Sequence, residues 1–303
     1  PGCVVLGARN GNIIYYQAFG HHTYNKHIQT NTHDLYDLAS ITKIASTAIG
    51  IMKLYDENKL DLNKSIGSYL SLSDTSQPAR VKLIDALSHQ GRLKAWYPFY
   101  TEMIDSLNNW EPKFFSEKET KNHKTIIAND IFGSQETIDT LYKILDTLPL
   151  REKEGYLYSD ISYYYTYRII SNLSGLPYDE FIYKSFYDKI GCHSLRFNPL
   201  KSFPKQKIVP TEMDTIFRTQ LVQGYVHDPG AALLGGICGH AGLFGNAIDL
   251  AKIGQLLLNK GTYGGEQFIR SETVEYFTKA HFRSKNNRRA IGFDKPDYRR
   301  NYI

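Results

Sequence analysis

The first twenty residues restrict the fold most strongly, because they predict a β-hairpin that cannot be stable alone. The segment CVVLGARNGNIIYYQAFG (3–20) contains two β-runs around Asn10-Gly11, the strongest short-range signal for a two-residue hairpin turn. An isolated two-stranded hairpin is marginal in water and needs further strands beside it. Between residues 21 and 290 the sequence offers no good strand candidate. We therefore expect the remaining strands of this sheet to lie beyond Ile303.

The remainder of the chain is predicted to be mainly helical, because apolar residues recur at helical spacing. The expected helices span residues 41–58, 81–90, 135–148, 159–175, 247–261 and 271–280. Residues 95–150 are polar and aromatic, and the mixed-charge run SEKETKNHK within them predicts a solvated loop. We expect a single domain of two lobes over 1–303, in a chain truncated at both ends. Its sheet side comprises 1–33 and 282–303, and its mainly helical side comprises 34–281.

Charge and cysteine content argue against several classes of protein. The chain has 36 Lys and Arg against 31 Asp and Glu. Seven of these basic and two of these acidic residues lie in 281–303, so the rest of the chain holds 29 of each and offers no basic face for nucleic acid. Cys3, Cys192 and Cys238 show neither a disulfide framework nor metal-ligand spacing. No apolar run reaches the roughly 18–20 residues of a membrane span. We expect no nucleic acid, metal, cofactor or membrane span.

A serine and a lysine three residues apart begin the first predicted helix. The segment DLYDLASITKIASTAIGIMKLYDE (34–57) places Ser40 at the helix start and Lys43 one turn later. Residues i and i+3 share a helix face, and a serine hydroxyl needs a base within reach to act as a nucleophile. Burial would suit Lys43 as a proton acceptor, and the helix N-terminus favours developing negative charge. The spacing alone fits an N-cap serine with a surface lysine equally well.

A second group of candidate residues precedes the helix predicted at 159–175. Tyr158, Ser159 and Asp160 lie in a loop that can present side chains. A tyrosine can act as a base when nearby cations stabilise its charged form. The chain has 23 tyrosines, so one Tyr-x-Asp means little by itself. The segment becomes a candidate for catalysis because the chain also contains Ser40 and Lys43.

Together these motifs resemble those of the penicillin-recognising serine hydrolases, which include class C β-lactamases, D,D-peptidases and related esterases. Related class A enzymes carry Ser-x-x-Lys with companion motifs, and class C relatives carry Tyr-x-Asn in the second position. Further similar segments are LYDENKLDLNKSIGSYL (54–70), LIDALSHQGRL (83–93) and CGHAGLFGNAIDLAKIGQLLLNKG (238–261). The resemblance implies a β-lactamase/transpeptidase-like α/β (α+β) fold. In this fold, one lobe is an antiparallel sheet flanked by helices, and the other lobe is mainly helical.

The resemblance is closest to a subgroup found in Bacteroidetes-type bacteria. The segments PTEMDTIFR (210–218) and GYVHDPGAALLGGICGHAGLFG (224–245) are similar to that subgroup. Its members often carry this domain fused behind a family 3 glycoside hydrolase that acts on N-acetylglucosaminides. The resemblance therefore implies a possible fused glycoside hydrolase in the parent protein.

The family resemblance assigns roles to four residues. Ser40 is expected to be the acylated nucleophile, which Lys43 helps to deprotonate. Tyr158 is expected to carry protons to the leaving group and to activate the deacylating water. Asp160 replaces the family's asparagine, which contacts the lysine and the substrate amide. A carboxylate there favours protonated Lys43, or it holds Lys43 in place and leaves Tyr158 as the base. The Ser40 N–H is expected to be one oxyanion donor.

Some features depart from the family pattern. The third family motif, K/H-T/S-G, is expected on a strand beyond Ile303. The tripeptide HAG (240–242) is not interpreted as this motif, because an apolar helix follows within five residues. Arg92 and Ser162 stand where the family usually has glycine or a small residue, which affects the expected shape of the substrate.

Several other polar and aromatic residues receive structural interpretations. His227 and Asp228 are adjacent and cannot easily face each other, so they are expected to brace a loop. His89 is expected to be a hydrogen-bonded structural histidine. A cluster of aromatic residues is expected to pack a long loop rather than to line a cleft. This cluster consists of Trp96, Tyr97, Phe99 and Tyr100.

Two functional hypotheses follow. The first is a serine hydrolase that forms an acyl-enzyme with a D,D-peptide, β-lactam, ester or related cell-wall amide, so its partner is a small-molecule or peptidoglycan-derived substrate. The second is a non-catalytic peptidoglycan-binding or accessory module, fused to a β-N-acetylglucosaminidase. Asp160 and the absent third motif favour the second, whereas the joint presence of Ser40, Lys43 and Tyr158 favours the first. The resemblance implies a periplasmic, secreted or cell-envelope location.

Overall fold

The hairpin predicted at the start of the chain is confirmed. A computed structural model describes residues 1–105, 107 and 109–296 of the chain. Strand β1 (Cys3–Arg9) pairs antiparallel with β2 (Asn12–Phe19). Asn10 and Gly11 adopt φ angles of 51° and 77°, and a two-residue type I′ turn requires positive φ at both positions.

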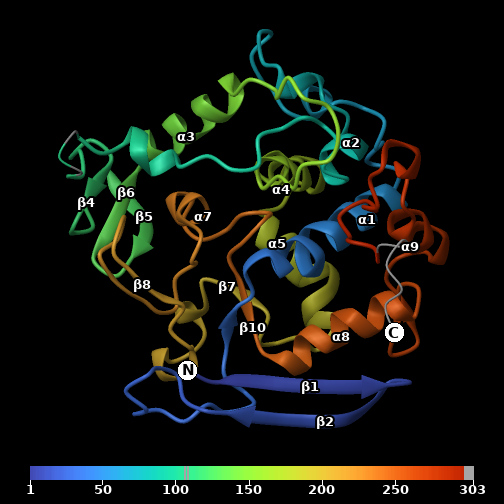
Figure 1. Cartoon of the computed structure of the whole chain (residues 1–303), viewed down its shortest axis with the longest axis horizontal. Coiled ribbons are helices and arrows are strands. Elements are labelled where there is room, and N and C mark those ends of the chain that lie inside the picture. Colours follow the sequence, from blue (N-terminus) through green and yellow to red (C-terminus); the bar gives the residue numbers. More distant parts are fainter. Residues whose placement is uncertain (106, 108, 297–303) are drawn as a thin grey trace.

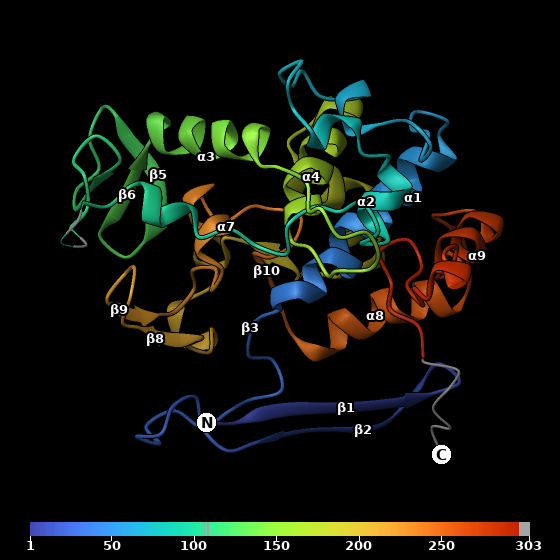
Figure 2. The ribbon, with the colours of Figure 1, turned by 45° about the horizontal axis from the view of Figure 1, so that its top comes forward.

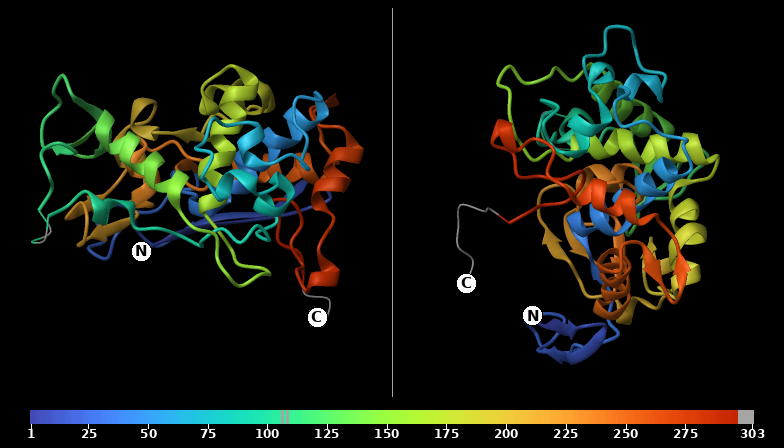
Figure 3. Two further views of the ribbon diagram at one scale, coloured as in Figure 1. Left: turned by 90° about the horizontal axis from the view of Figure 1, so that it is seen from above. Right: turned by 90° about the vertical axis from the view of Figure 1, so that its right-hand side faces the viewer.

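The hairpin lies at one edge of the molecule (Figure 3, right). Helix α8 (Ala247–Leu258) lies along it (Figure 1). Within the described residues no further strand pairs with β1 or β2. Val5, Tyr15 and Phe19 remain 42–44 % exposed. The expectation that further strands complete this sheet falls outside the described residues and stays a prediction.

Helix α1 (Ile49–Asp56) runs through the helical part of the molecule, and five of its eight residues are buried. It packs against α4 (Ile161–Ser174) and α9 (Ser271–Thr278). Gly50 permits close packing, because a Cβ atom there would lie 2.8 Å from Ile182 Cδ1. Each fully buried aliphatic side chain contributes about 1.5–3 kcal/mol, so this contact region anchors the turn that precedes α1.

Five of the six predicted helices are confirmed, several of them with shorter limits, whereas the helix predicted over 41–58 is regular α-helix only over Ile49–Asp56. Helix α3 (Gln135–Thr147) begins at an N-cap serine, Ser134, whose side chain accepts a hydrogen bond from Thr137 N. Helix α4 ends at Gly175, which adopts φ 72°, as expected for a glycine C-cap. The shorter helices are α2 (Leu83–Leu87), α5 (Tyr178–Ile182), α6 (Asp188–Ile190) and α7 (Pro229–Leu233).

The expectation that residues 21–290 contain no strands is wrong. Within the described residues, short antiparallel strands form two three-stranded sheets and two further pairs. One sheet has the order β4 (Phe115–Ser116), β6 (Ile131–Ser134), β5 (His123–Ala128). A second has the order β3 (Tyr36–Asp37), β10 (Leu243–Gly245), β7 (Arg196–Phe197). The pairs are β8 (Glu212–Asp214) with β9 (Gln220–Val222), and β11 (Thr262–Tyr263) with β12 (Glu266–Gln267).

These strands were missed because they span two to six residues, too few to show an alternating pattern, and because partners far along the chain define them. The mixed-charge run between β4 and β5 is exposed, as expected of a solvated loop. Figure 2 shows β5 and β6 at one end of the molecule and α1 and α9 at the other.

The described part of the C-terminal segment returns to the helical body. Gly292 N donates to Leu87 O at 3.0 Å, and Ile291 N donates to Phe277 O at 3.0 Å. Asn287 Nδ2 also donates to Ser88 O at 3.0 Å. Residues 297–303 lie outside the described part. The division into a sheet side (1–33 and 282–303) and a helical side therefore stays a prediction.

Candidate active site

Ser40 lies on an irregular turn between β3 and α1. A 3-10 turn (Ala39–Ile41) is followed by a π-helical segment (Lys43–Ala48) before regular α-helix begins. The sequence pattern predicted a continuous helix here, and π-helical turns of this kind often occur at functional sites. Ala39 has a φ of 45°, a conformation that disfavours any residue with a Cβ atom. The turn leaves Ser40 exposed while Lys43 is buried.

The Lys43 ammonium group lies at the centre of the site. Lys43 Nζ donates to Ser40 Oγ at 2.8 Å and to His240 O at 3.3 Å. It also lies 2.6 Å from Asp160 Oδ1, an ion pair whose angle is outside hydrogen-bond geometry. The two hydrogen-bond partners are oxygen acceptors, and the Asp160 carboxylate adds a negative charge beside the ammonium group.

The loop that carries Tyr158 and Asp160 is fixed by backbone contacts to the segment after α2. Ser159 N donates to His89 Nδ1 at 2.9 Å, and Asp160 N donates to Ala95 O at 2.8 Å. The half-buried Tyr158 ring has its centroid 5.0 Å from Lys43 Nζ. The structure thus brings together Ser40, Lys43, Tyr158 and Asp160, the four residues singled out from the sequence.

His89 is a hydrogen-bonded structural histidine, as the sequence analysis predicted. Its Nδ1 accepts the Ser159 N–H, and its ring lies 4.6 Å from the Tyr158 ring between centroids. Burial lowers the pKa of His89 to about 3, assisted by the positive charges of Arg289 and Lys43. The imidazole is therefore neutral at physiological pH, and it supports the Tyr158 loop without adding charge to the site.

Arg289 is a site residue that the sequence analysis missed. Its guanidinium carbon lies 5.0 Å from the Tyr158 ring centroid and 5.9 Å from that of Tyr156. Tyr158 is therefore flanked by two cations, Lys43 and Arg289. The sequence shows only a basic segment at 281–303, and no local pattern there points to a tyrosine more than a hundred residues earlier.

A buried ion pair lies directly behind Lys43. His240 Nε2 lies 2.8 Å from Asp228 Oδ1, and the His240 ring packs on Tyr164 at 4.5 Å between centroids. Burial would lower the pKa of His240, but the Asp228 carboxylate outweighs it and raises that pKa to about 10. Burial would likewise raise the pKa of Asp228, but His240 lowers it to about 2. The pair is charged at neutral pH, and the backbone carbonyl of His240 contacts Lys43.

The prediction for His227 and Asp228 is confirmed. They do not pair with each other, because His227 Nε2 lies 3.1 Å from Glu212 Oε2 while Asp228 binds His240. Asp228 also caps α7 by accepting Ala231 N at 2.7 Å. Both residues therefore connect loops around the site.

The aromatic cluster packs the loop after α2, as predicted for two of its members. Phe99 is buried against Tyr164, with centroids 5.3 Å apart, and Tyr100 stacks on Phe217 at 5.0 Å. Trp96 differs, because half of its surface is exposed.

The two departures from the family pattern occupy structured positions. Arg92 adopts a φ of 59° and donates from Nε to Arg151 O at 2.6 Å, so it joins two loops. Ser162 is buried on α4.

The HAG tripeptide leads into β10, which lies between β3 and β7. The expectation that the third motif lies beyond Ile303 concerns residues outside this chain and stays a prediction.

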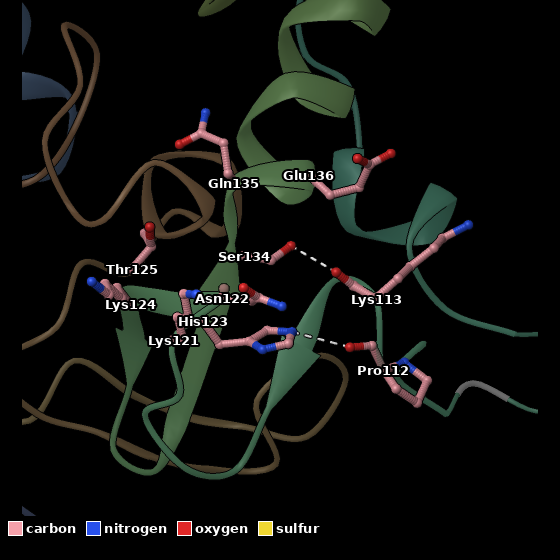
Figure 4. Close-up of a pocket in the computed structure, with 11 residues that line it drawn as sticks. Pro112, Lys113, Lys121, Asn122, His123, Lys124, Thr125, Ser134, Gln135 and Glu136 are labelled. Atoms are coloured by element: carbon pink, nitrogen blue, oxygen red, sulfur yellow. Dashed lines mark hydrogen bonds between the residues drawn. The ribbon is translucent and has the colours of Figure 1, made fainter.

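A separate cavity lies elsewhere (Figure 4). It has a volume of about 730 Å³ and is formed by β5, β6 and the start of α3. His123 points into it and contacts Pro112 O at 3.0 Å. Ser40, Lys43, Tyr158 and Asp160 do not line it. Its position gives no reason to assign it to the Ser40 centre.

Within residues 1–105, 107 and 109–296, no cluster of three or more His, Cys, Asp or Glu side chains is arranged to hold a metal ion. In the same part of the chain, every helix is too short or too polar to cross a bilayer.

A Ser-x-x-Lys pair ahead of a buried helix, beside a Tyr-x-Asp loop where relatives carry Tyr-x-Asn, resembles the arrangement in the penicillin-recognising proteins. A family model described as Beta-lactamase matches residues 1–294. The chain belongs to the beta-lactamase family, and its fold is the β-lactamase and penicillin-binding-protein fold.

Relatives and solved structures agree with this family. The chain is 30 % identical over 306 residues to the "N-acetylmuramyl-L-alanine amidase" of Bacillus subtilis (strain 168), and 30 % identical over 305 residues to the "Putative D-alanyl-D-alanine carboxypeptidase" of Escherichia coli (strain K12). Each match covers 92 % of this chain and 64 % of the relative. The chain thus spans less than two thirds of these curated relatives.

Among solved structures, the octameric penicillin-binding protein homologue from Pyrococcus abyssi superposes with a TM-score of 0.66 at 19 % identity, covering 92 % of this chain and 56 % of that one. The class C beta-lactamase from Rhodobacter sphaeroides gives a TM-score of 0.62 at 17 % identity, covering 92 % of this chain and 66 % of that one. At these identities the two structures establish the fold alone.

Proposed function

We propose that this protein is a serine hydrolase that forms an acyl-enzyme on Ser40. The observation that carries the proposal is the 2.8 Å hydrogen bond between Lys43 Nζ and Ser40 Oγ. It joins an exposed hydroxyl to a lysine that is only 2 % exposed. Burying a lysine is costly unless it is paired, and here its neighbours are the nucleophile, Asp160 and a backbone carbonyl. A structural N-cap serine would need no such buried cation beside it.

The surroundings of Lys43 favour Tyr158 as the base. Asp160 and the His240 carbonyl both stabilise a protonated Lys43, which then cannot accept the serine proton. Lys43 and Arg289 flank the Tyr158 ring, which places this tyrosine in the same cluster as Ser40. In this mechanism Ser40 Oγ attacks the acyl carbon while its proton passes to the Tyr158 oxygen. Tyr158 gives that proton to the departing amine or alcohol and later activates the water that releases the acyl group.

The Ser40 backbone N–H and the N-terminal end of the following helix are suited to the oxyanion. The proposal places the acyl oxygen beside these groups, and fixed N–H donors of this kind supply a large part of catalysis in acyl transfer. No cofactor is required for any of these steps, because each is a proton transfer or an attack by an oxygen nucleophile.

The proposed substrate is an acyl donor of the bacterial cell wall or a mimic of one. Relatives named as a D-alanyl-D-alanine carboxypeptidase and a cell-wall amidase support a D,D-peptide or related amide. A β-lactam or an ester remains within the same chemistry. These names also support a periplasmic, secreted or cell-envelope location. The resemblance to the Bacteroidetes-type subgroup supports a parent protein in which a family 3 glycoside hydrolase is fused to this domain.

A second candidate function is a peptidoglycan-binding module without catalysis. The observation that favours it is the 2.6 Å contact between Lys43 and Asp160. In a module of this type the ion pair would lock Lys43 as a structural cation, and Tyr158 would remain protonated. Such a module would bind cell-wall fragments without cleaving them.

Turnover measurements on the full-length protein separate the two candidates. The substrate panel is a D-alanyl-D-alanine peptide, a chromogenic β-lactam, an activated ester and purified peptidoglycan, each with wild type and Ser40→Ala. The hydrolase predicts release of product from at least one acyl donor, lost in Ser40→Ala. Binding of peptidoglycan that is equal in wild type and Ser40→Ala, with no turnover of any substrate, would contradict it and support the binding module.

A further inference from the structure

The residue before the proposed nucleophile is held in an unfavourable backbone conformation. Ala39 has a φ of 45°, within the left-handed region that glycine tolerates and that a Cβ atom disfavours. Strained backbone of this kind persists where surrounding contacts impose it, and it is concentrated at active sites. Because Ala39 directly precedes Ser40, its conformation sets the direction in which the Ser40 side chain leaves the turn.

The Asp37 carboxylate contacts Ala39 directly. Asp37 Oδ1 accepts a hydrogen bond from Ala39 N at 2.8 Å, and its other oxygen, Oδ2, accepts one from His227 N at 2.6 Å. Burial raises the pKa of Asp37, while both N–H donors oppose that shift. One carboxylate therefore joins the strained turn to the loop around residue 227.

The other end of this connection is rigid. Arg218 is completely buried, and its guanidinium donates to Val226 O at 2.6 Å and to His227 O at 2.7 Å. Its Nε donates to Asp214 Oδ2 at 2.7 Å. The peptide groups on both sides of His227 are thus fixed from the β8–β9 hairpin, and Asp37 binds a backbone N–H that has little freedom to move.

Other contacts fix the residues on either side of Ala39. Leu38 N donates to Leu243 O at 2.9 Å, and Leu243 N donates to Thr42 Oγ1 at 3.2 Å. These bonds hold the ends of the turn against β10. The bond from Asp37 acts on Ala39 itself, at the residue with the unfavourable φ.

We propose that Asp37 is a positioning residue: its carboxylate holds Ala39 in the left-handed conformation and thereby aims Ser40 at the acyl donor. The inference rests on the proposed function, because it assumes that Ser40 is the nucleophile. Asp37 does not touch the reacting atoms and acts through the backbone of Ala39. A misplacement of about 1 Å in a reacting group can cost about a hundredfold in rate, so losing this carboxylate should slow acylation.

The test is a double-mutant cycle between Asp37 and Ala39 in the full-length protein. Four proteins are compared: the wild type, Asp37→Ala, Ala39→Gly and the variant that carries both changes. For each, acylation of Ser40 by a fluorophosphonate probe is followed over time at several probe concentrations. We expect Asp37→Ala to lower the maximal acylation rate constant about tenfold, with little change in the half-saturating concentration. With glycine at position 39 the loss should shrink to about threefold or less, because glycine adopts positive φ without support.

Three controls accompany the cycle. Asp37→Asn keeps an acceptor for Ala39 N and should give an intermediate rate. Asp61→Ala removes the same type of contact elsewhere, where Asp61 Oδ1 accepts Asn63 N at 2.9 Å, and should leave acylation unchanged. Thermal unfolding gives the folded fraction to which each rate is normalised. If Asp37→Ala does not fold, the cycle is run with Asp37→Asn.

Each result has a distinct meaning. Absence of label on folded wild type would overturn the proposed function and the inference with it. A labelled wild type with equal rates in the Asp37 variants would overturn the inference alone. An equal loss with alanine and with glycine at position 39 would also overturn it, because Asp37 would then act by another route. A loss that glycine reverses supports it, since a contact that serves stability only would change the unfolding temperature and leave the normalised rate unchanged.

Discussion

The Ser40 centre and the β1–β2 hairpin are held together in opposite ways. The hairpin depends on a backbone ladder between residues at most sixteen positions apart, and its apolar side chains remain partly exposed. The Ser40 centre depends on buried polar contacts between segments far apart in the chain, such as Lys43 Nζ to His240 O across 197 positions. Substitutions in the hairpin should therefore have local effects. Substitutions around Ser40 should change both the stability of the protein and the rate of acylation.

The largest expected effect comes from removing the central cation. Lys43→Met should lower the rate of Ser40 acylation by about 10²–10⁴-fold, the usual contribution of a group that assists proton transfer. The measurement is a time course of labelling by the fluorophosphonate probe. Lys59→Met removes an exposed lysine that pairs with Glu57 at 2.8 Å and should have no effect. If folded Lys43→Met protein were labelled at the wild-type rate, Lys43 would have no role in the chemistry of Ser40.

The next largest effect should come from the buried arginine behind the site. Arg218→Met leaves Asp214 and two backbone carbonyls without their partner, so we expect a loss of about 3–5 kcal/mol in the free energy of unfolding. Denaturant unfolding measures this loss. The matched control is Arg270→Met, whose side chain is 56 % exposed and pairs with Asp56 at 3.2 Å, and it should cost less than about 1 kcal/mol. If the two variants lost similar free energies of unfolding, burial of Arg218 would not explain its contribution to stability.

A pH series sharpens the comparison for the buried His240–Asp228 pair. The folded pKa of His240 is raised from 6.5 to about 10, so its stabilisation is fully present below pH 6.5 and is lost as pH rises toward about 10. Over that window the wild type should lose more stability than Asp228→Asn, which lacks the carboxylate, by up to about 5 kcal/mol. Denaturant unfolding at several pH values checks this. If the stability of the two proteins changed with pH in parallel, the Asp228 carboxylate would not raise the pKa of His240 on folding, and the prediction would be wrong.

The smallest effect should come from the hairpin turn. Gly11→Ala places a Cβ atom at φ 77° and should destabilise the protein by about 1 kcal/mol, with acylation of Ser40 unchanged. Gly254→Ala makes the same chemical change within α8, where the added Cβ meets no atom within 4 Å, and should instead stabilise by up to about 1 kcal/mol. An effect of Gly11→Ala on the acylation rate of folded protein would break the proposed independence of the two regions.

The sequence was sufficient for features whose signals lie within a few residues of one another. Asn10-Gly11 specifies the hairpin turn through its backbone preferences, and the Ser40–Lys43 spacing predicts contact because one helical turn joins the two side chains. Gly175, which ends α4, likewise acts on its own segment. Such features are decided locally before tertiary packing contributes.

Features that depend on distant partners were beyond the sequence. Arg289 reaches Tyr158 only because residues 287–292 pack against α2, and a basic segment carries no sign of that packing. The strands β3 and β10 are two and three residues long and exist because they pair with each other. The positive φ of Ala39 was equally invisible, since alanine disfavours it and only the surrounding contacts impose it.

The central claim, that Ser40 is an activated nucleophile, is tested most directly by peptide mass spectrometry after labelling. The full-length protein is incubated with an activated fluorophosphonate and, separately, with a fluorescent penicillin, beside the Ser40→Ala variant. We predict an adduct on the peptide that contains Ser40, absent from the variant. No adduct on folded wild-type protein with either probe, or an adduct that persists in Ser40→Ala, would contradict the account.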